Sequence, residues 1–195
     1  MAGRRNSRSR GASGSGEGED RAPRPPADPE AAAREICLRL LTFSPRTRAQ
    51  LAEALARKDI PQEAADRVLS RFTEVGLIDD EAFAQAWVRS RHNGKGLAPR
   101  ALSAELRRRG VADDTIQEAV AELHPEDIEE AARALVSRKL RTTRSLDHDR
   151  RTRRLVGMLA RKGYSPGLAY RVVKEVLAGE AADPDELPED GFLDD

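Results

Sequence analysis

Arginine and lysine are the residues of this 195-residue chain whose spacing most directly indicates a function, namely the binding of anionic groups. They gather in and around three leucine-containing segments. Guanidinium and ammonium groups that recur along a surface can neutralise the phosphates of a nucleic acid or the carboxylates of an acidic protein surface. The candidate binding residues are Arg46, Arg48, Arg91, Lys95, Arg100, Arg107, Arg108, Arg109, Arg138, Lys139, Arg150, Arg151, Arg153, Arg154, Arg161 and Lys162.

The formal net charge of zero hides a strong segregation of charge along the chain. Residues 179–195 hold eight acidic residues and no basic one, whereas residues 1–29 hold six arginines and four acidic residues. The middle of the chain therefore carries an excess of about six positive charges. This excess favours a polyanionic partner and salt-sensitive binding, although a basic surface that only contacts solvent would have the same composition.

The basic residues indicate binding through charge and not through base recognition. Aromatic residues make up only 4% of the chain and do not alternate with the basic ones, so neither base stacking nor sequence-specific readout is expected. We interpret Phe83 and Trp87 as core residues. Residues 138–162 carry about eight excess positive charges, and we expect this segment to provide most of the salt-dependent binding.

Motifs for catalysis and metal binding are not evident. Gly94-Lys95-Gly96 lacks the spacing of a phosphate-binding loop and is predicted to be an ordinary loop. The acidic residues 79–81 have no histidine nearby and are better explained as the capped start of a helix than as a metal site. Cys37 is predicted to be a small core residue and not a nucleophile. We therefore expect a protein that is not an enzyme and needs neither a cofactor nor a metal.

The leucine-containing segments form an internal repeat. Leu51–Lys58, Leu102–Arg109 and Leu155–Lys162 share the pattern Leu-x-x-x-Leu-x-x-(Lys/Arg), and Asp59, Gly110 and Gly163 follow them. The paired leucines lie on one face of a helix, the cation lies in its last turn, and a glycine in the left-handed conformation ends it. Each segment is therefore predicted to be a helix with a basic end.

Amphipathic helices are predicted on both sides of each segment, so the chain is all-α with three repeats of three helices. Their apolar positions are Ile36, Leu40, Leu41, Phe43, Ala65, Val68, Leu69 and Phe72 in the first repeat, Phe83, Ala84, Trp87, Val88, Ile116, Ala119, Val120 and Leu123 in the second, and Ile128, Ala132, Leu135, Val136, Ala169, Val172, Val173 and Val176 in the third. A unit of roughly 50 residues has little core of its own, so the repeats should stack into an elongated, curved array.

The expected organisation has five parts. Residues 1–29 are predicted to be a disordered arm rich in Arg, Gly, Ser and Pro, and residues 179–195 a disordered acidic tail. The three repeats are predicted to span residues 30–78, 79–124 and 125–178. The single cysteine, together with the lack of a long apolar stretch or a secretory signal, favours a cytoplasmic protein, and without an evident dimer element we expect a monomer.

Several motifs resemble those of the RecX family of recombinase regulators over residues 33–178. An Arg-x-Arg turn, Pro45-Arg46-Thr47-Arg48, precedes the first leucine segment, which departs from the family pattern at Asp59. Residues 77–84 have the order Leu-Ile-Asp-Asp-x-x-Phe-Ala typical of the middle unit. Trp87, Arg91, Gly94-Lys95-Gly96 and residues 105–111 continue the resemblance, whereas the third unit matches mainly in its general pattern.

The resemblance implies a role in DNA repair, homologous recombination and the SOS response. Such a protein would bind in the helical groove of the RecA filament, contact adjacent subunits, and restrain strand exchange, ATP hydrolysis and co-protease activity. It would also bind single- and double-stranded DNA without sequence specificity. Two alternatives stay open, namely a helical DNA-binding transcription regulator and an interaction scaffold that does not bind nucleic acid. The acidic tail would aid solubility or fold back on the basic surface as a DNA mimic.

Overall fold

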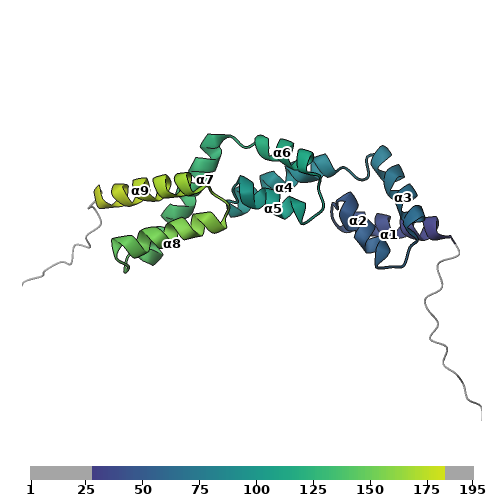
Figure 1. Ribbon diagram of the computed structural model, residues 1–195, viewed down its shortest axis with the longest axis horizontal. Coiled ribbons are helices and arrows are strands. Elements are labelled where there is room, and N and C mark those ends of the chain that lie inside the picture. The colour runs from purple at the N-terminus through teal and green to yellow at the C-terminus, as the bar shows by residue number, and fades with distance from the viewer. Residues whose placement is uncertain (1–27, 183–195) are drawn as a thin grey trace, which may run out of the picture.

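The computed structural model describes residues 28–182, with side chains to residue 180. Within this range all regular structure is helical, with nine α-helices and one 3-10 turn. Figure 1 shows three groups of helices that follow one another in an elongated, shallow arc. The expected all-α array of three three-helix repeats is confirmed. Most of the arm and of the acidic tail lies outside the described residues, so their predicted disorder stays a prediction.

Repeat 1 consists of α1 (Pro29–Phe43), α2 (Arg48–Ala56) and α3 (Gln62–Glu74). Asp28 begins α1 by accepting a hydrogen bond from the Ala31 backbone N–H at 3.0 Å, so Pro29 opens a helix and does not close the arm. Thr47 and Gln50 begin α2 with a reciprocal capping box.

Repeat 2 consists of α4 (Asp80–Lys95), α5 (Pro99–Arg107) and α6 (Asp113–Ala121). Asp79 caps α4, since the Ala82 backbone N–H donates to its carboxylate at 2.8 Å, as the acidic run 79–81 indicated. The expectation of a loop at residues 94–96 was wrong. Lys95 is the last residue of α4, and Gly96 ends it with a left-handed φ of 60°.

Repeat 3 consists of α7 (Pro125–Leu140), the 3-10 turn η1 (Arg141–Thr143), α8 (His148–Arg161) and α9 (Pro166–Ala182). Asp147 caps α8 by accepting from the Arg150 backbone N–H at 2.9 Å. The last helix extends four residues beyond the predicted end of the repeat at residue 178, because the Gly-Glu-Ala-Ala sequence there continues the helix before Pro184.

Each repeat has a hydrophobic core of its own, whereas we expected a unit of this size to have little, and Ala98 of repeat 2 joins the core of repeat 3. The six leucines of the repeated pattern are all buried, and they fall into three separate clusters. Cys37 is fully buried in the first cluster, and burial raises the pKa of its thiol to about 11, so it is an unreactive core residue. Phe43, which we placed on the apolar face of α1, is 80% exposed at the end of that helix.

Single hydrogen bonds to backbone carbonyls join the repeats at two equivalent junctions. Between repeats 1 and 2, the Thr47 hydroxyl donates to the Arg109 carbonyl at 2.6 Å. Between repeats 2 and 3, the Ala98 backbone N–H donates to the Lys162 carbonyl at 2.9 Å. Thr47 and Ala98 are the N-cap residues of α2 and α5, and the two carbonyls follow α5 and α8. The second helices are therefore linked end to end along the array (Figure 1).

The glycine after each linked carbonyl is needed both for its conformation and for space. Gly110 and Gly163 have φ values of 75° and 89°, as the repeat pattern predicted. A Cβ at Gly110 would collide with the Ala49 Cβ, and one at Gly163 would collide with the backbone N of Ala101. The equivalent residue of repeat 1, Asp59, also has a positive φ of 54°, but no repeat precedes it in the described chain. Asp is tolerated there because only the conformation is constrained.

We predict that Gly110→Ala destabilises the protein more than Gly76→Ala. Both glycines have φ near 75°, but nothing lies within 4 Å of a Cβ at Gly76. Gly76→Ala should therefore lower the free energy of unfolding by about 1 to 2 kcal/mol through backbone strain. Gly110→Ala should lower it by about 1 to 3 kcal/mol more, because Ala49 must also move. Urea unfolding followed by circular dichroism measures both, and equal losses would contradict the close junction.

Candidate functional site: cationic clusters at the repeat junctions

Two arginines and a glutamate surround the indole ring of Trp87 in repeat 2. The guanidinium carbon of Arg109 lies 3.6 Å from the ring centroid, and that of Arg91 lies 4.2 Å from it. The indole Nε1 donates to a carboxylate oxygen of Glu105 at 2.8 Å. These contacts hold two cationic groups in fixed positions beside the junction with repeat 1. The pKa of Arg109 is lowered, mainly by burial, and the negative charge of Glu105 partly offsets this effect.

The interpretation of Phe83 and Trp87 as core residues was only partly right. Both pack against the core of repeat 2 but are half-buried, and their rings stack with centroids 5.8 Å apart. Aromatic rings therefore do lie among the basic residues, contrary to our expectation. The signal was present in the sequence, because Phe83, Trp87 and Arg91 are spaced four residues apart and so share one face of α4.

A cleft of about 600 Å³ opens beside this cluster, between repeats 1 and 2. Leu41, Leu77 and Trp87 are among its apolar lining residues, and Arg46 and Arg109 supply positive charge. Arg46 is half-buried, and its Nε is buried without a hydrogen-bond partner within residues 28–182. A buried donor of this kind is unfavourable until an acceptor reaches it.

Arg48 contributes to the same junction through its backbone. Its N–H donates to the carboxylate of Asp80 at 2.9 Å, so the first residue of α4 caps the start of α2. The carboxylates of Asp79 and Asp80 are thus both used at helix N-termini, one within its own repeat and one across the junction. The cross-repeat contact could not be read from the sequence, because it depends on how the repeats pack.

Three cations meet at the second junction. Lys162 Nζ donates to the Lys95 backbone carbonyl, and Arg138 and Lys95 lie close enough to disfavour its charged form. The pKa of Lys162 is lowered, first by burial and then by these two positive neighbours. None of the three has an ion-pair partner among the described residues. An anion placed between them would relieve the repulsion, which makes this cluster a suitable phosphate site.

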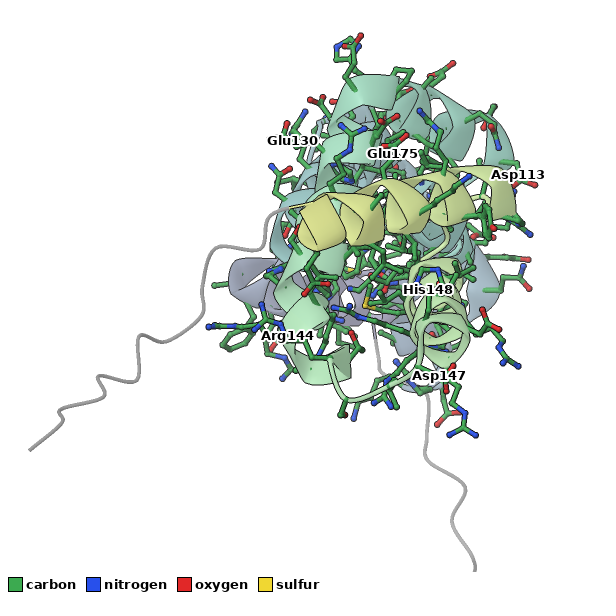
Figure 2. All side chains as sticks on the ribbon, turned by 90° about the vertical axis from the view of Figure 1, so that its left-hand side faces the viewer. Asp113, Glu130, Arg144, Asp147, His148 and Glu175 are labelled. Carbon is green, nitrogen blue, oxygen red and sulfur yellow. The ribbon has the colours of Figure 1, made fainter. Side chains whose placement is uncertain are left out.

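The other candidate residues are mostly exposed, and some are already paired. Arg107 pairs with Asp113 at 2.7 Å, and Arg150 pairs with Asp147 at 3.2 Å. Exposed candidates that form no ion pair within residues 28–182 are Arg100, Arg108, Lys139, Arg153, Arg154 and Arg161. Seen end-on in Figure 2, Arg144 and Asp147 lie on the opposite side of α9 from Glu130 and Glu175, so acidic groups occur on both sides of repeat 3.

Arg151 has contacts that fit a structural role. Only 14% of its side chain is exposed, and it donates to the Leu140 carbonyl at 3.2 Å and the Thr143 hydroxyl at 3.0 Å. It also pairs with Glu180 near the end of α9. These bonds tie the α7–η1 connection to α8 and α9, so we leave Arg151 out of the proposed contact residues.

Three segments of the chain match the successive domains of one family. Residues 33–72 match the RecX first three-helix domain, residues 79–120 the second, and residues 126–173 the third. The chain belongs to the RecX family. The regulatory protein RecX of Streptomyces coelicolor is 62% identical over 168 residues, which cover 86% of this chain and 89% of that protein. That of Thermobifida fusca is 58% identical over 167 residues, covering 85% and 90%.

Solved structures of RecX proteins have the same fold. The crystal structure of RecX from Lactobacillus salivarius aligns with a TM-score of 0.72 at 19% identity and covers 78% of this chain and 99% of that one. A second crystal structure of regulatory protein RecX aligns with a TM-score of 0.70 at 29% identity, covering 76% and 73%. These relatives identify this RecX protein as a regulatory protein built from helical repeats.

Within residues 28–182, no three His, Cys, Asp or Glu side chains are grouped closely enough to hold a metal ion. In the same range, no helix combines the length and apolar character needed to cross a bilayer.

We predict that Arg151→Ala destabilises repeat 3, whereas Arg150→Ala does not. Loss of Arg151 removes its hydrogen bonds to the Thr143 hydroxyl and the Leu140 carbonyl and its ion pair with Glu180 in a half-buried site, which should cost about 2 kcal/mol of unfolding free energy. Arg150 is exposed, and the loss of its surface ion pair should cost less than about 0.5 kcal/mol. Thermal unfolding of the two variants checks this, and equal midpoints would show that Arg151 is available for a partner.

Proposed function

We propose that this RecX protein binds the RecA filament on DNA and restrains strand exchange, ATP hydrolysis and co-protease activity. The observation that carries the proposal is the pair of cationic clusters held at the two repeat junctions. Each cluster contains groups whose charge or hydrogen-bonding capacity is not satisfied among the described residues, namely Arg46 Nε at the first junction and Lys95, Arg138 and Lys162 at the second. Family membership supports the regulatory role.

The spacing of the clusters suits an extended polyanionic surface. The two junctions lie at opposite ends of α5, whose nine residues span roughly 14 Å along the helix axis. Further exposed cations lie on α5, between the two junctions, and on α7 and α8 in repeat 3. An array of this length can contact neighbouring subunits of a helical polymer and nearby phosphates at the same time.

Regulation would follow from unequal affinity for different states of the filament. A preformed array fits best where the spacing of its binding surfaces matches the subunit spacing of one filament state. Binding then shifts the filament toward that state by the difference in binding free energy. It also occupies surface that an incoming duplex or a co-protease substrate would need. No chemical step by this chain is required.

Titration of the chain into RecA on single-stranded DNA at fixed salt tests the proposal. We expect ATP hydrolysis to fall at well below one chain per RecA subunit, because one array contacts several subunits. The control is RecA filament without the chain. Ordinary DNA binding without any change in ATP hydrolysis or strand exchange would contradict the proposal and favour the DNA-binding transcription regulator.

The cluster at the second junction predicts a specific salt effect. Lys95→Gln with Arg138→Gln removes two unpaired exposed cations, so affinity for single-stranded DNA should fall and the slope of log K against log salt should decrease by about 1.4. The control, Arg107→Gln with Arg133→Gln, removes the same net charge from cations that already pair with Asp113, Glu129 and Glu175. Anisotropy of labelled DNA across a salt series measures both. Equal slopes for the two double variants would remove the junction from the binding site.

A further inference from the structure

Repeat 1 and its link to repeat 2 expose several large apolar side chains, one of which lines the cleft between the two repeats. Within the described residues, five large apolar side chains are exposed, and four of them (Leu38, Phe43, Val75 and Leu77) belong to repeat 1 or its link to repeat 2. Leu77 lines the cleft itself and is 48% exposed. An exposed apolar side chain in a cleft whose other walls are also apolar is a common feature of a site for a protein partner.

The charges that remain free in this cleft are positive. Asp79 also lines the cleft, but its carboxylate accepts the Ala82 N–H and is engaged by the start of α4. Arg46 and Arg109 have no ion-pair partner among the described residues within 4 Å. The buried Arg46 Nε is still without an acceptor. A carboxylate from outside would therefore pair with guanidinium groups that have no ion-pair partner of their own within the described residues.

The lining of the cleft favours a protein side chain over a nucleobase. Two guanidinium groups already lie against the Trp87 ring, within 4.2 Å of its centroid, so little of that ring is available to stack on a base. The remaining walls include the aliphatic residues Leu41, Pro45 and Leu77. The cleft between repeats 2 and 3 is different, because its lining mixes the acidic residues Glu122, Asp127 and Glu130 with Arg89 and Arg138.

We propose that the cleft between repeats 1 and 2 binds an acidic segment of a partner protein, which inserts one large apolar side chain. The apolar side chain packs on Leu41, Leu77 and Phe83, and the flanking carboxylates meet Arg46 and Arg109. Burial of such an anchor in a pocket, with charged groups at its rim, is how a few residues provide most of the affinity of a protein interface. The inference rests on the proposed function for the identity of the partner, which is then a segment at the surface of the RecA filament.

A pair of substitutions two residues apart tests the proposal on the full chain. Leu77→Glu places a carboxylate in the cleft, where it pairs with the arginines and repels an acidic segment. Val75→Glu adds the same charge at a residue that is equally exposed, at 49%, but does not line the cleft. Leu77→Glu should weaken binding to RecA filaments on single-stranded DNA by about tenfold or more, a loss of the size expected for an interface anchor. Val75→Glu should change it by less than about twofold.

Binding to naked single-stranded DNA is measured on the same variants. Equal filament binding by Leu77→Glu and Val75→Glu, with both folded by circular dichroism, would overturn the proposal. A parallel loss of naked-DNA binding in Leu77→Glu alone would also overturn it, because the cleft would then hold nucleic acid.

Trp87 provides a readout that does not depend on RecA, since it is the only tryptophan in the chain. Its fluorescence should change saturably with the peptide Glu-Asp-Leu-Phe-Asp-Glu. The change should be absent when the peptide acids are replaced by amides, when Leu-Phe is replaced by Ala-Ala, or in Leu77→Glu. If the chain binds the peptide but does not bind RecA filaments, the proposed function is refuted and the proposal that the cleft binds an acidic segment stands. If the chain regulates RecA filaments but neither the peptide nor Leu77→Glu has an effect, the proposed function stands and the proposal for the cleft is refuted.

Discussion

The array depends on one small contact that is made twice. At each junction the carbonyl that precedes a left-handed glycine accepts a hydrogen bond from the residue that caps the preceding second helix. Because every repeat has a core of its own, burial of apolar surface within the repeats does not fix how they sit relative to one another. The close approach at Gly110 and Gly163 does so, and it requires the absence of a Cβ at both positions. These contacts act together with the other hydrogen bonds across the junctions, such as that from the Arg48 N–H to Asp80 and that from the Tyr164 hydroxyl to the Gly96 carbonyl, to hold the arc seen in Figure 1.

The same contact places the basic groups. Arg109 and Lys162 occupy equivalent positions, and each offers its carbonyl to the junction while its side chain joins a cationic cluster. Lys58 occupies this position in repeat 1, where no earlier repeat is described. The geometry of the joint and the position of the charge are thus coupled, so a partner that contacts both clusters would sense how the repeats are arranged. This coupling is the physical reason to propose that the affinity of the array depends on the subunit spacing of the filament.

Sequence patterns predicted the helices well and the surfaces less well. Leucines at i and i+4, with Gly110 and Gly163 after them, placed the second helices and their ends, because a helix stop is a local property. Burial was less predictable, since it depends on neighbours from other helices. Phe43 is exposed because α1 ends before its side chain meets a partner. Arg151 lies in a run of arginines and was therefore predicted to bind a partner. Its structural role could not be seen in the sequence, because the groups that it contacts belong to α7, η1 and α9. The cleft beside Trp87 exists only between two repeats, so no single segment could reveal it.

The proposed regulation requires the three repeats to form a preformed rigid array that keeps its shape on a partner. Spin labels at Asp66→Cys in α3 and Lys174→Cys in α9 would report the distance between repeats 1 and 3, both positions being exposed. The buried Cys37, whose pKa is raised to about 11, should stay unlabelled. Double electron–electron resonance should give one narrow distance distribution that is unchanged when the chain binds RecA filaments. A broad distribution in the free chain, or a shift larger than its width on binding, would contradict the account.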